Sequence, residues 1–131
     1  MASLPTESTK TVQHRSLEQI PVEHLNPLLE RQIISGEKGM VSRLLLRKGC
    51  VVPLHHHENE QITWIIEGAL RFTLDEGDDA PRERIVRAGE LLVIPANVPH
   101  SAEALEDTID VDFFSPPRAD WLAGTDAYLR R

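Results

Sequence analysis

The sequence is poor in cysteine, in basic residues and in long apolar runs. Cys50 is the only cysteine, which excludes an intramolecular disulfide and is typical of a reducing compartment. Its 14 lysine and arginine residues are outnumbered by 21 acidic residues, and the net charge of -7 disfavours nucleic acid and anionic membranes as partners. The apolar runs are too short for a membrane span, and residues 1–10 lack the apolar core of a signal peptide. We therefore expect a cytoplasmic protein without a nucleic-acid or membrane partner.

The length of 131 residues supports one domain of ordinary soluble composition. Because the chain up to about Ser16 is rich in Ser, Thr, Glu and Lys, we expect residues 1–20 to form a flexible N-terminal arm. Residues 21–131 are expected to form the folded domain, and residues 118–131 to include a short terminal helix.

Short apolar segments alternate with turn residues through most of the chain. These segments predict strands over residues 28–35, 41–47, 51–54, 61–66, 69–74, 82–87, 91–94 and 108–114. Strands that recur at intervals of about ten residues favour an all-β sandwich or barrel. Within it, Trp64 and Phe72 are expected to pack in the interior, and Trp121 to anchor the C-terminal tail.

The segment from His55 to Gln61 contains the strongest chemical signal. Side chains alternate across a strand, so His55, His57 and Gln61 share one face, while His56 and Glu60 point the other way. Two histidines at this spacing are a common source of imidazole ligands for a metal. A loop after His57 would break the alternation, and Glu60 is then the alternative ligand. A polar surface strand that carries its histidines by chance is the competing interpretation.

A further histidine, His100, follows a buried strand and a turn that Pro95 and Pro99 stiffen. With it, the sequence resembles the cupin superfamily over about residues 40–115. The first cupin motif is matched by Gly49, His55, His57, Gln61 in the usual place of Glu, and Gly68; the second is matched by Gly89, Pro95, Asn97 in the usual place of Gly, and His100. Asn is an understandable replacement for Gly, because it tolerates a left-handed backbone.

This resemblance implies a single cupin barrel, of the jelly-roll or double-stranded β-helix type, with an N-terminal arm and a short C-terminal tail. It also implies one divalent metal ion on His55, His57, Gln61 and His100. The ligand types admit Ni, Zn, Mn, Fe or Cu. Gln61 leaves the site with a formal charge of +2, where a carboxylate ligand would leave +1. The ion is then a stronger Lewis acid and attracts anionic substrate groups.

A narrower resemblance comes from the segment Asp110–Arg118. Together with the histidines and Gln61, it is similar to small pectin-degradation cupins that open the ring of unsaturated uronates. In that family an Asp and a Phe on the last barrel strand work beside the metal, which implies these roles for Asp112 and Phe114. Strand alternation places Asp112 and Phe114 on the same face as Asp110. A solvated polar face is the alternative.

The leading functional hypothesis is a metal-dependent isomerase that acts on a small anionic sugar derivative. Asp112 is expected to move a proton, Phe114 to shape the pocket wall and Arg118 to bind a substrate carboxylate. The alternatives are an Fe- or Mn-dependent cupin dioxygenase and a non-catalytic module that binds a metal or a small molecule. We also expect a homodimer, to which residues 25–35 contribute by adding a strand to a partner's sheet edge.

Overall fold

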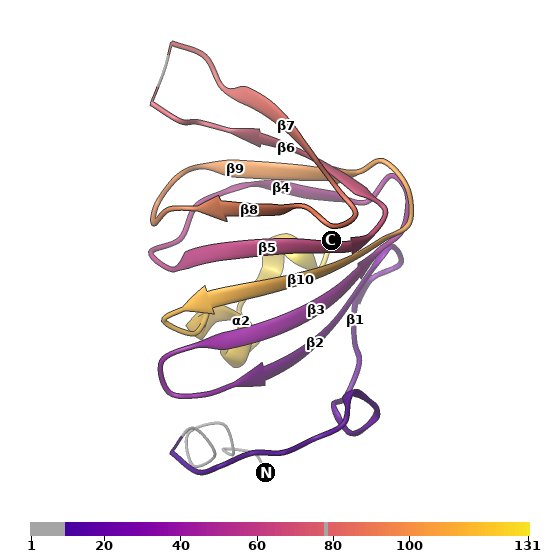
Figure 1. The fold of residues 1–131 in the computed structure, drawn as a ribbon, viewed down its shortest axis with the longest axis vertical. Helices are drawn as coiled ribbons and strands as arrows, with labels where there is room; N and C mark the ends of the chain where they lie inside the picture. The colour runs from indigo at the N-terminus through magenta and orange to yellow at the C-terminus, as the bar shows by residue number, and fades with distance from the viewer. Residues whose placement is uncertain (1–9, 78) are drawn as a thin grey trace.

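The computed structural model describes residues 10–77 and 79–131, which form two antiparallel β-sheets (Figure 1). The six-stranded sheet has the order β1-β2-β3-β10-β5-β8, and the four-stranded sheet has the order β4-β9-β6-β7. The strands of the first sheet are β1 (Glu23–Asn26), β2 (Leu29–Ser35), β3 (Met40–Leu46), β10 (Thr108–Ser115), β5 (Glu60–Glu67) and β8 (Leu91–Ile94). Those of the second are β4 (Val51–His55), β9 (His100–Ala104), β6 (Ala69–Leu74) and β7 (Arg82–Arg87). The expected all-β class is confirmed.

Every predicted strand is present, with ends that shift by one residue or two at most. Two short strands of the described chain were not predicted. Strand β9 reads His-Ser-Ala-Glu-Ala and lacks the β-branched and aromatic residues that signal a strand. Strand β1 has four residues and pairs only with β2. On the side of β2 away from β3, β1 is opposite only Leu29, Glu30 and Arg31, and β1 is itself the edge of the sheet.

The core lies between the inner faces of the two sheets. Strand β3 shows the pattern, because Met40, Ser42, Leu44 and Leu46 are buried while Val41, Arg43 and Leu45, which alternate with them, are half-buried. Burying a side chain of this size stabilises the fold by about 1.5–3 kcal/mol. The prediction for Phe72 is confirmed, since it is 3% exposed, but the prediction for Trp64 is wrong, since it is 42% exposed. Trp64 lies on the outer face of β5, where the sheet has no second layer within the described chain.

The C-terminal segment returns to the open side of the sandwich as helix α2 (Ala119–Ala123) and the short 3-10 helix η2 (Ala127–Leu129). Figure 1 shows α2 beside β10 and β3. Trp121 is buried and packs edge-on against Phe114, with 4.9 Å between the ring centroids, so its expected role as the anchor of the tail is confirmed. Gly124 ends α2 in a left-handed conformation, with φ of 71°.

A buried ion pair ties this segment to β2. The Nη1 atom of Arg31 lies 2.6 Å from Oδ2 of Asp126, and both side chains are fully buried. The guanidinium also stacks over Trp121 at 4.4 Å and bonds Glu23 on β1. The pair therefore links strands β1 and β2 to the segment that covers one side of the barrel interior.

Residues 1–9 of the expected N-terminal arm lie outside the described residues. Further along the arm, the side-chain amide of Gln13 donates a hydrogen bond to Ser35 O. Gln32 on β2 donates to the carbonyl oxygens of Leu17 and Ile20. The part from residue 13 to residue 20 therefore has anchor points along β2. None of the helices in the described part of the chain is long and apolar enough to cross a bilayer.

We predict that Asp126→Asn lowers the free energy of unfolding by about 1.5–3 kcal/mol, because it removes the buried carboxylate that Arg31 Nη1 bonds and leaves only the half-buried Glu23 to balance the guanidinium. Chemical denaturation followed by circular dichroism measures this loss. Glu103→Gln is the matched control, because it breaks a surface pair of the same 2.6 Å length with Arg71, and should cost about 1 kcal/mol or less. Equal losses in the two variants would show that the Arg31–Asp126 pair does not hold the C-terminal segment.

Candidate metal centre

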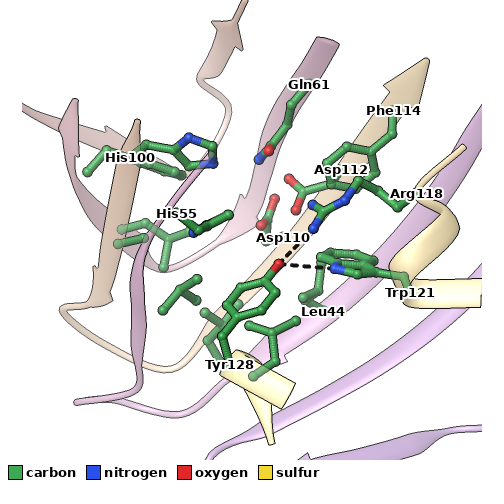
Figure 2. A pocket seen from close by; sticks show the side chains of 16 residues that line it. Leu44, His55, Gln61, His100, Asp110, Asp112, Phe114, Arg118, Trp121 and Tyr128 are labelled. Carbon is green, nitrogen blue, oxygen red and sulfur yellow. Dashed lines mark hydrogen bonds between the residues drawn. The ribbon is translucent and has the colours of Figure 1, made fainter. Parts of the chain in front are cut away.

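Three histidines from two strands and one loop converge inside the barrel. His55 ends β4 and is paired in register with His100, which begins β9. His57 follows β4 in the loop before β5, and one possible ligand atom of each histidine lies within 4.8 Å of the others. Figure 2 shows His55 and His100 directed toward the same space as the amide of Gln61. The structure brings together all four residues that the sequence pattern selected, whereas Glu60 is exposed.

Backbone carbonyl groups fix the orientation and the tautomer of each imidazole. The Nδ1 atoms of His55, His57 and His100 lie 2.7, 3.0 and 2.8 Å from the carbonyl oxygens of Pro53, Asn59 and Val98, respectively. Since a carbonyl oxygen only accepts, each Nδ1 carries the proton and donates it. The lone pair of each neutral ring is therefore on Nε2, which is how histidine ligands are commonly held.

Burial keeps these rings unprotonated. Desolvation, followed by the charge of His100, lowers the pKa of His55 to about 3. Desolvation and the nearby Arg118 lower the pKa of His57 to about 4. The pKa of His100 is lowered by the same two effects, with burial the larger. All three rings therefore present free lone pairs at neutral pH, as a metal requires.

A row of hydrogen bonds turns the Gln61 amide toward the histidines. Ionised Asp112 only accepts, so the Thr63 hydroxyl donates its hydrogen to Asp112 Oδ1 at 2.7 Å. Thr63 Oγ1 then accepts from Gln61 Nε2 at 2.9 Å. This leaves Gln61 Oε1 at 3.1 Å from His57 Nε2. Two acceptor atoms face each other without a hydrogen between them, which is an arrangement that a shared cation satisfies. The donor set fits a divalent metal ion.

The loops around the histidines are tied down by two asparagines. Asn97 has φ of 63°, so the left-handed conformation expected for this replacement of Gly is confirmed. Its backbone N–H donates to His57 O at 2.7 Å. The Asn59 side-chain amide donates to Pro116 O at 2.6 Å and thereby joins the histidine loop to the segment before Arg118. The loop that carries His57 is therefore held from two directions.

A cavity adjoins the histidines, lined by Asp110, Asp112 and Phe114 from β10 and by residues of the C-terminal segment (Figure 2). Phe114 is 2% exposed and its ring contacts that of His57 edge-on, at 5.7 Å between centroids. The predicted alternation on β10 is confirmed, because Asp110, Asp112 and Phe114 are buried while the intervening residues are not. Sequence pattern alone therefore identified the pocket face of this strand.

The two carboxyl groups have raised pKa values. Burial raises the pKa of Asp112 to about 6, although the hydrogen bonds that it accepts oppose the shift. Burial and the adjacent Asp112 raise the pKa of Asp110 well above its usual range. Oδ1 of Asp110 has no hydrogen-bond partner among the described residues. The cavity therefore contains one carboxyl group with a pKa of about 6 beside a second whose pKa is raised by burial and by its neighbour.

Arg118 is 2% exposed and lines the same cavity. Its Nε and Nη2 atoms donate to Asp120, and Nη2 also donates to the Tyr128 hydroxyl at 2.8 Å. Its Nη1 atom is buried and has no partner within the described chain. Because a buried unsatisfied donor is costly, this nitrogen is well suited to bind an acceptor group of a ligand.

Two residues of the site were missed from the sequence. Thr63 lies two positions after Gln61, so alternation could have placed it on the same inner face. Tyr128 comes from the tail, stacks on His55 at 4.8 Å between centroids, and accepts hydrogen bonds from Arg118 and Trp121. No local pattern marks Tyr128, because its role arises from the return of the C-terminal segment.

Comparison with known proteins agrees with this geometry. Residues 42–115, more than half of the chain, match the family described as Cupin domain. No curated protein sequence matches the chain.

The similar solved structures are also cupins or carry the same fold. An RmlC-like cupin from Shewanella frigidimarina has a TM-score of 0.76 and 24% identity, over 86% of this chain and 98% of its own. KdgF from Halomonas sp. has a TM-score of 0.74 and 29% identity, over 85% and 99% of the two chains. Oxalate decarboxylase from Lactobacillus farciminis has a TM-score of 0.73 at 21% identity, over 86% of this chain and 38% of its own.

We predict about one divalent ion per chain in the purified protein, as in other closed sites with four protein ligands. His55→Ala, His57→Ala and His100→Ala should each lose most of this metal, because each removes one converging lone pair. His56→Ala is the matched control, since His56 is exposed and belongs to the opposite face. Elemental analysis by mass spectrometry measures the content. Unchanged metal in all three ligand variants would contradict the assignment.

We also predict that Thr63→Val weakens metal binding by about 10- to 100-fold, the usual effect of losing a group that orients a ligand. Valine has the shape of threonine but cannot hold the Gln61 amide in its orientation. Thr63→Ser keeps the hydroxyl and should retain most of the affinity. Titration of the metal-free variants with one divalent ion makes the comparison, and equal affinities for valine and serine would rule out this orienting role.

Proposed function

The chain belongs to the cupin family, and we propose that it is a metal-dependent isomerase that opens the ring of an unsaturated uronate or a similar small anionic sugar. The observation that carries the proposal is the position of Arg118. Its buried and unpartnered Nη1 lines the cavity that also contains Asp112 and the candidate metal ligands. An anionic substrate would satisfy this nitrogen while its reacting atoms lie between the histidines and Asp112.

The charge distribution favours a substrate with a carboxylate. Arg118 keeps one donor free while Asp120 and Tyr128 hold the rest of its guanidinium. A carboxylate is a strong partner for a guanidinium in a buried site. The neutral ligands add to this preference, because they leave a bound divalent ion with its full charge of +2.

Asp112 is the residue best placed to move a proton. It is 4% exposed, lies on the cavity side of β10 and has a pKa raised to about 6 by burial. A general acid or base works best when its pKa is close to the working pH. Phe114 forms the neighbouring wall and excludes water from the space beside His57. A divalent ion supplies Lewis acidity toward an oxygen atom of the substrate.

Two further observations support a sugar-acid isomerase. The sequence resembles pectin-degradation cupins at His55, His57, Gln61 and in the segment Asp110–Arg118. KdgF from Halomonas sp. is similar at 29% identity over nearly its whole length. An Fe- or Mn-dependent dioxygenase is the competing enzyme class. The neutral amide of Gln61 weighs against it, because many non-haem Fe(II) oxygenases use two histidines and a carboxylate.

We predict that Asp112→Asn retains the metal content but lowers turnover of an unsaturated uronate monosaccharide by roughly 100- to 10,000-fold. Asparagine keeps the shape of the side chain and removes the group that exchanges a proton. Metal content and turnover are measured on one preparation. Asp107→Asn, at an exposed position, is the matched control and should retain both.

Four other outcomes would each reject this assignment. Near-normal turnover in Asp112→Asn would show that the carboxylate is not the acid or base. Loss of metal together with activity would make Asp112 a direct metal ligand, because the amide oxygen of asparagine still accepts the Thr63 hydrogen bond that orients Gln61. Oxygen consumption by the Fe(II)-loaded protein without uronate turnover would favour the dioxygenase, and thermal stabilisation by the sugar without turnover would favour a non-catalytic module.

A further inference from the structure

Tyr128 lies where two spaces of the molecule meet. It lines the cavity beside the candidate metal ligands and also an outer pocket of about 450 Å³, which Glu58 and Asp120 line as well. His55 and Arg118 likewise border both spaces. The inner cavity of about 40 Å³ has room for only a few water molecules. A sugar that reaches the histidines must therefore extend into the outer pocket, and it passes Tyr128.

The Tyr128 hydroxyl is an acceptor twice over. Its oxygen accepts hydrogen bonds from Arg118 Nη2 at 2.8 Å and from Trp121 Nε1 at 3.1 Å, and Figure 2 shows both bonds at the side of the cavity. A guanidinium and an indole nitrogen can only donate, so the phenolic hydrogen takes part in neither bond. Among the described residues, no acceptor lies within hydrogen-bond distance of it. The hydroxyl can therefore donate to a ligand.

The surrounding contacts hold this hydroxyl in place. The ring of Tyr128 stacks on that of His55, with 4.8 Å between the centroids. The next residue, Leu129, is buried, and its carbonyl oxygen accepts a hydrogen bond from the side-chain amide of Asn26 at 2.8 Å. Two positions before Tyr128, Asp126 is fixed by the buried ion pair described above. A donor that is fixed before a ligand arrives loses little conformational entropy on binding.

A second donor, Nη1 of Arg118, lies next to this hydroxyl. It is buried and has no partner within the described chain. Because it belongs to the same planar guanidinium whose Nη2 bonds Tyr128, Nη1 and the hydroxyl are close neighbours. Asp120 accepts from Nε and Nη2 and fixes the plane of the group. Two adjacent donors match the two oxygens of a carboxylate, which is well suited to two-point binding.

We propose that Tyr128 is a substrate-binding residue, whose hydroxyl donates to one carboxylate oxygen of the substrate while Arg118 Nη1 donates to the other. The identity of the substrate as an unsaturated uronate rests on the function proposed above. The two-point contact itself is a property of any carboxylate in this site, so an acid that does not react can test it. The contact makes the junction of the two spaces selective for sugar acids, because a neutral sugar gives Nη1 no charged partner.

Tyr128 is the only tyrosine of the chain, so the contact can be observed in the natural protein. Protein labelled with carbon-13 at tyrosine Cζ gives a single resonance in a nuclear magnetic resonance spectrum. We expect D-glucuronate, added to protein loaded with diamagnetic zinc, to shift this resonance, because donation to an anion changes the electron density of the phenol. The neutral methyl ester of glucuronate should shift it much less. Glucuronate that does not bind by calorimetry, or that binds without moving the resonance, would overturn the proposal.

The variant Tyr128→Phe removes the hydroxyl and keeps the ring. We expect it to bind glucuronate about 10- to 100-fold more weakly, the usual effect of losing a hydrogen bond to a charged group. Its metal content and its affinity for the methyl ester should not change, because Asp120 still holds Arg118. Ser115→Ala is the matched control, since it removes an exposed hydroxyl that lines neither space, and it should alter neither affinity.

Turnover separates this proposal from the isomerase assignment. With an unsaturated uronate, Tyr128→Phe should raise KM and leave kcat nearly unchanged, because the carboxylate contact is present both before and during the reaction. Equal weakening of glucuronate and its methyl ester would show that the hydroxyl only supports the fold, and would overturn the proposal. Selective weakening of glucuronate in a protein that does not turn over the unsaturated uronate would support the carboxylate contact and reject the isomerase.

Discussion

Three imidazole lone pairs that point to one buried place are the arrangement on which the rest of the site depends. Burial keeps the rings of His55, His57 and His100 neutral, and the carbonyl groups behind them hold every proton on Nδ1. The three Nε2 atoms are all hydrogen-bond acceptors, so they form no stabilising hydrogen bonds with one another. Their orientation has to come from the loops, and Asn97 and Asn59 supply part of it. A cation stabilises the cluster by giving all of these acceptors one common partner.

The hydrogen bonds from Gln61 through Thr63 to Asp112 connect a candidate metal ligand to the residue proposed to move a proton. The carboxylate fixes the direction of the threonine hydroxyl, and the hydroxyl fixes which end of the Gln61 amide faces His57. Protonation of Asp112 would therefore loosen the orientation of a candidate ligand as well as change the acid or base. Arg118 adds a positive charge that lowers the pKa of Asp112 against the effect of burial. A change of charge at Asp112 or Arg118 therefore affects proton transfer, the orientation of Gln61 and the binding of an anion together.

Local sequence patterns predicted the features that depend on neighbouring residues, namely strand faces and backbone conformation. Alternation along β10 selected the correct face, and the left-handed preference of Asn predicted the backbone at Asn97. His57 and Gln61 converge with His55 although residues 56–59 form a loop, so strand alternation does not account for that part of the site. The features that the sequence did not predict depend on contacts between segments that are far apart in the chain. Tyr128 reaches His55 only because the tail folds back, and the exposure of Trp64 depends on whether another layer covers its sheet. Strand β9 forms through pairing with β4 and β6, despite weak intrinsic preference.

Strands β5 and β10 show why the two faces of one sheet carry different constraints. Gln61 and Thr63 point into the barrel, whereas Ile62 and Trp64 between them point outward. On β10, Asp110, Asp112 and Phe114 line the cavity, whereas Val111 and Phe113 point to the outer face of the sheet. A one-residue shift in either strand would bury apolar side chains in the polar cavity and expose the carboxylates.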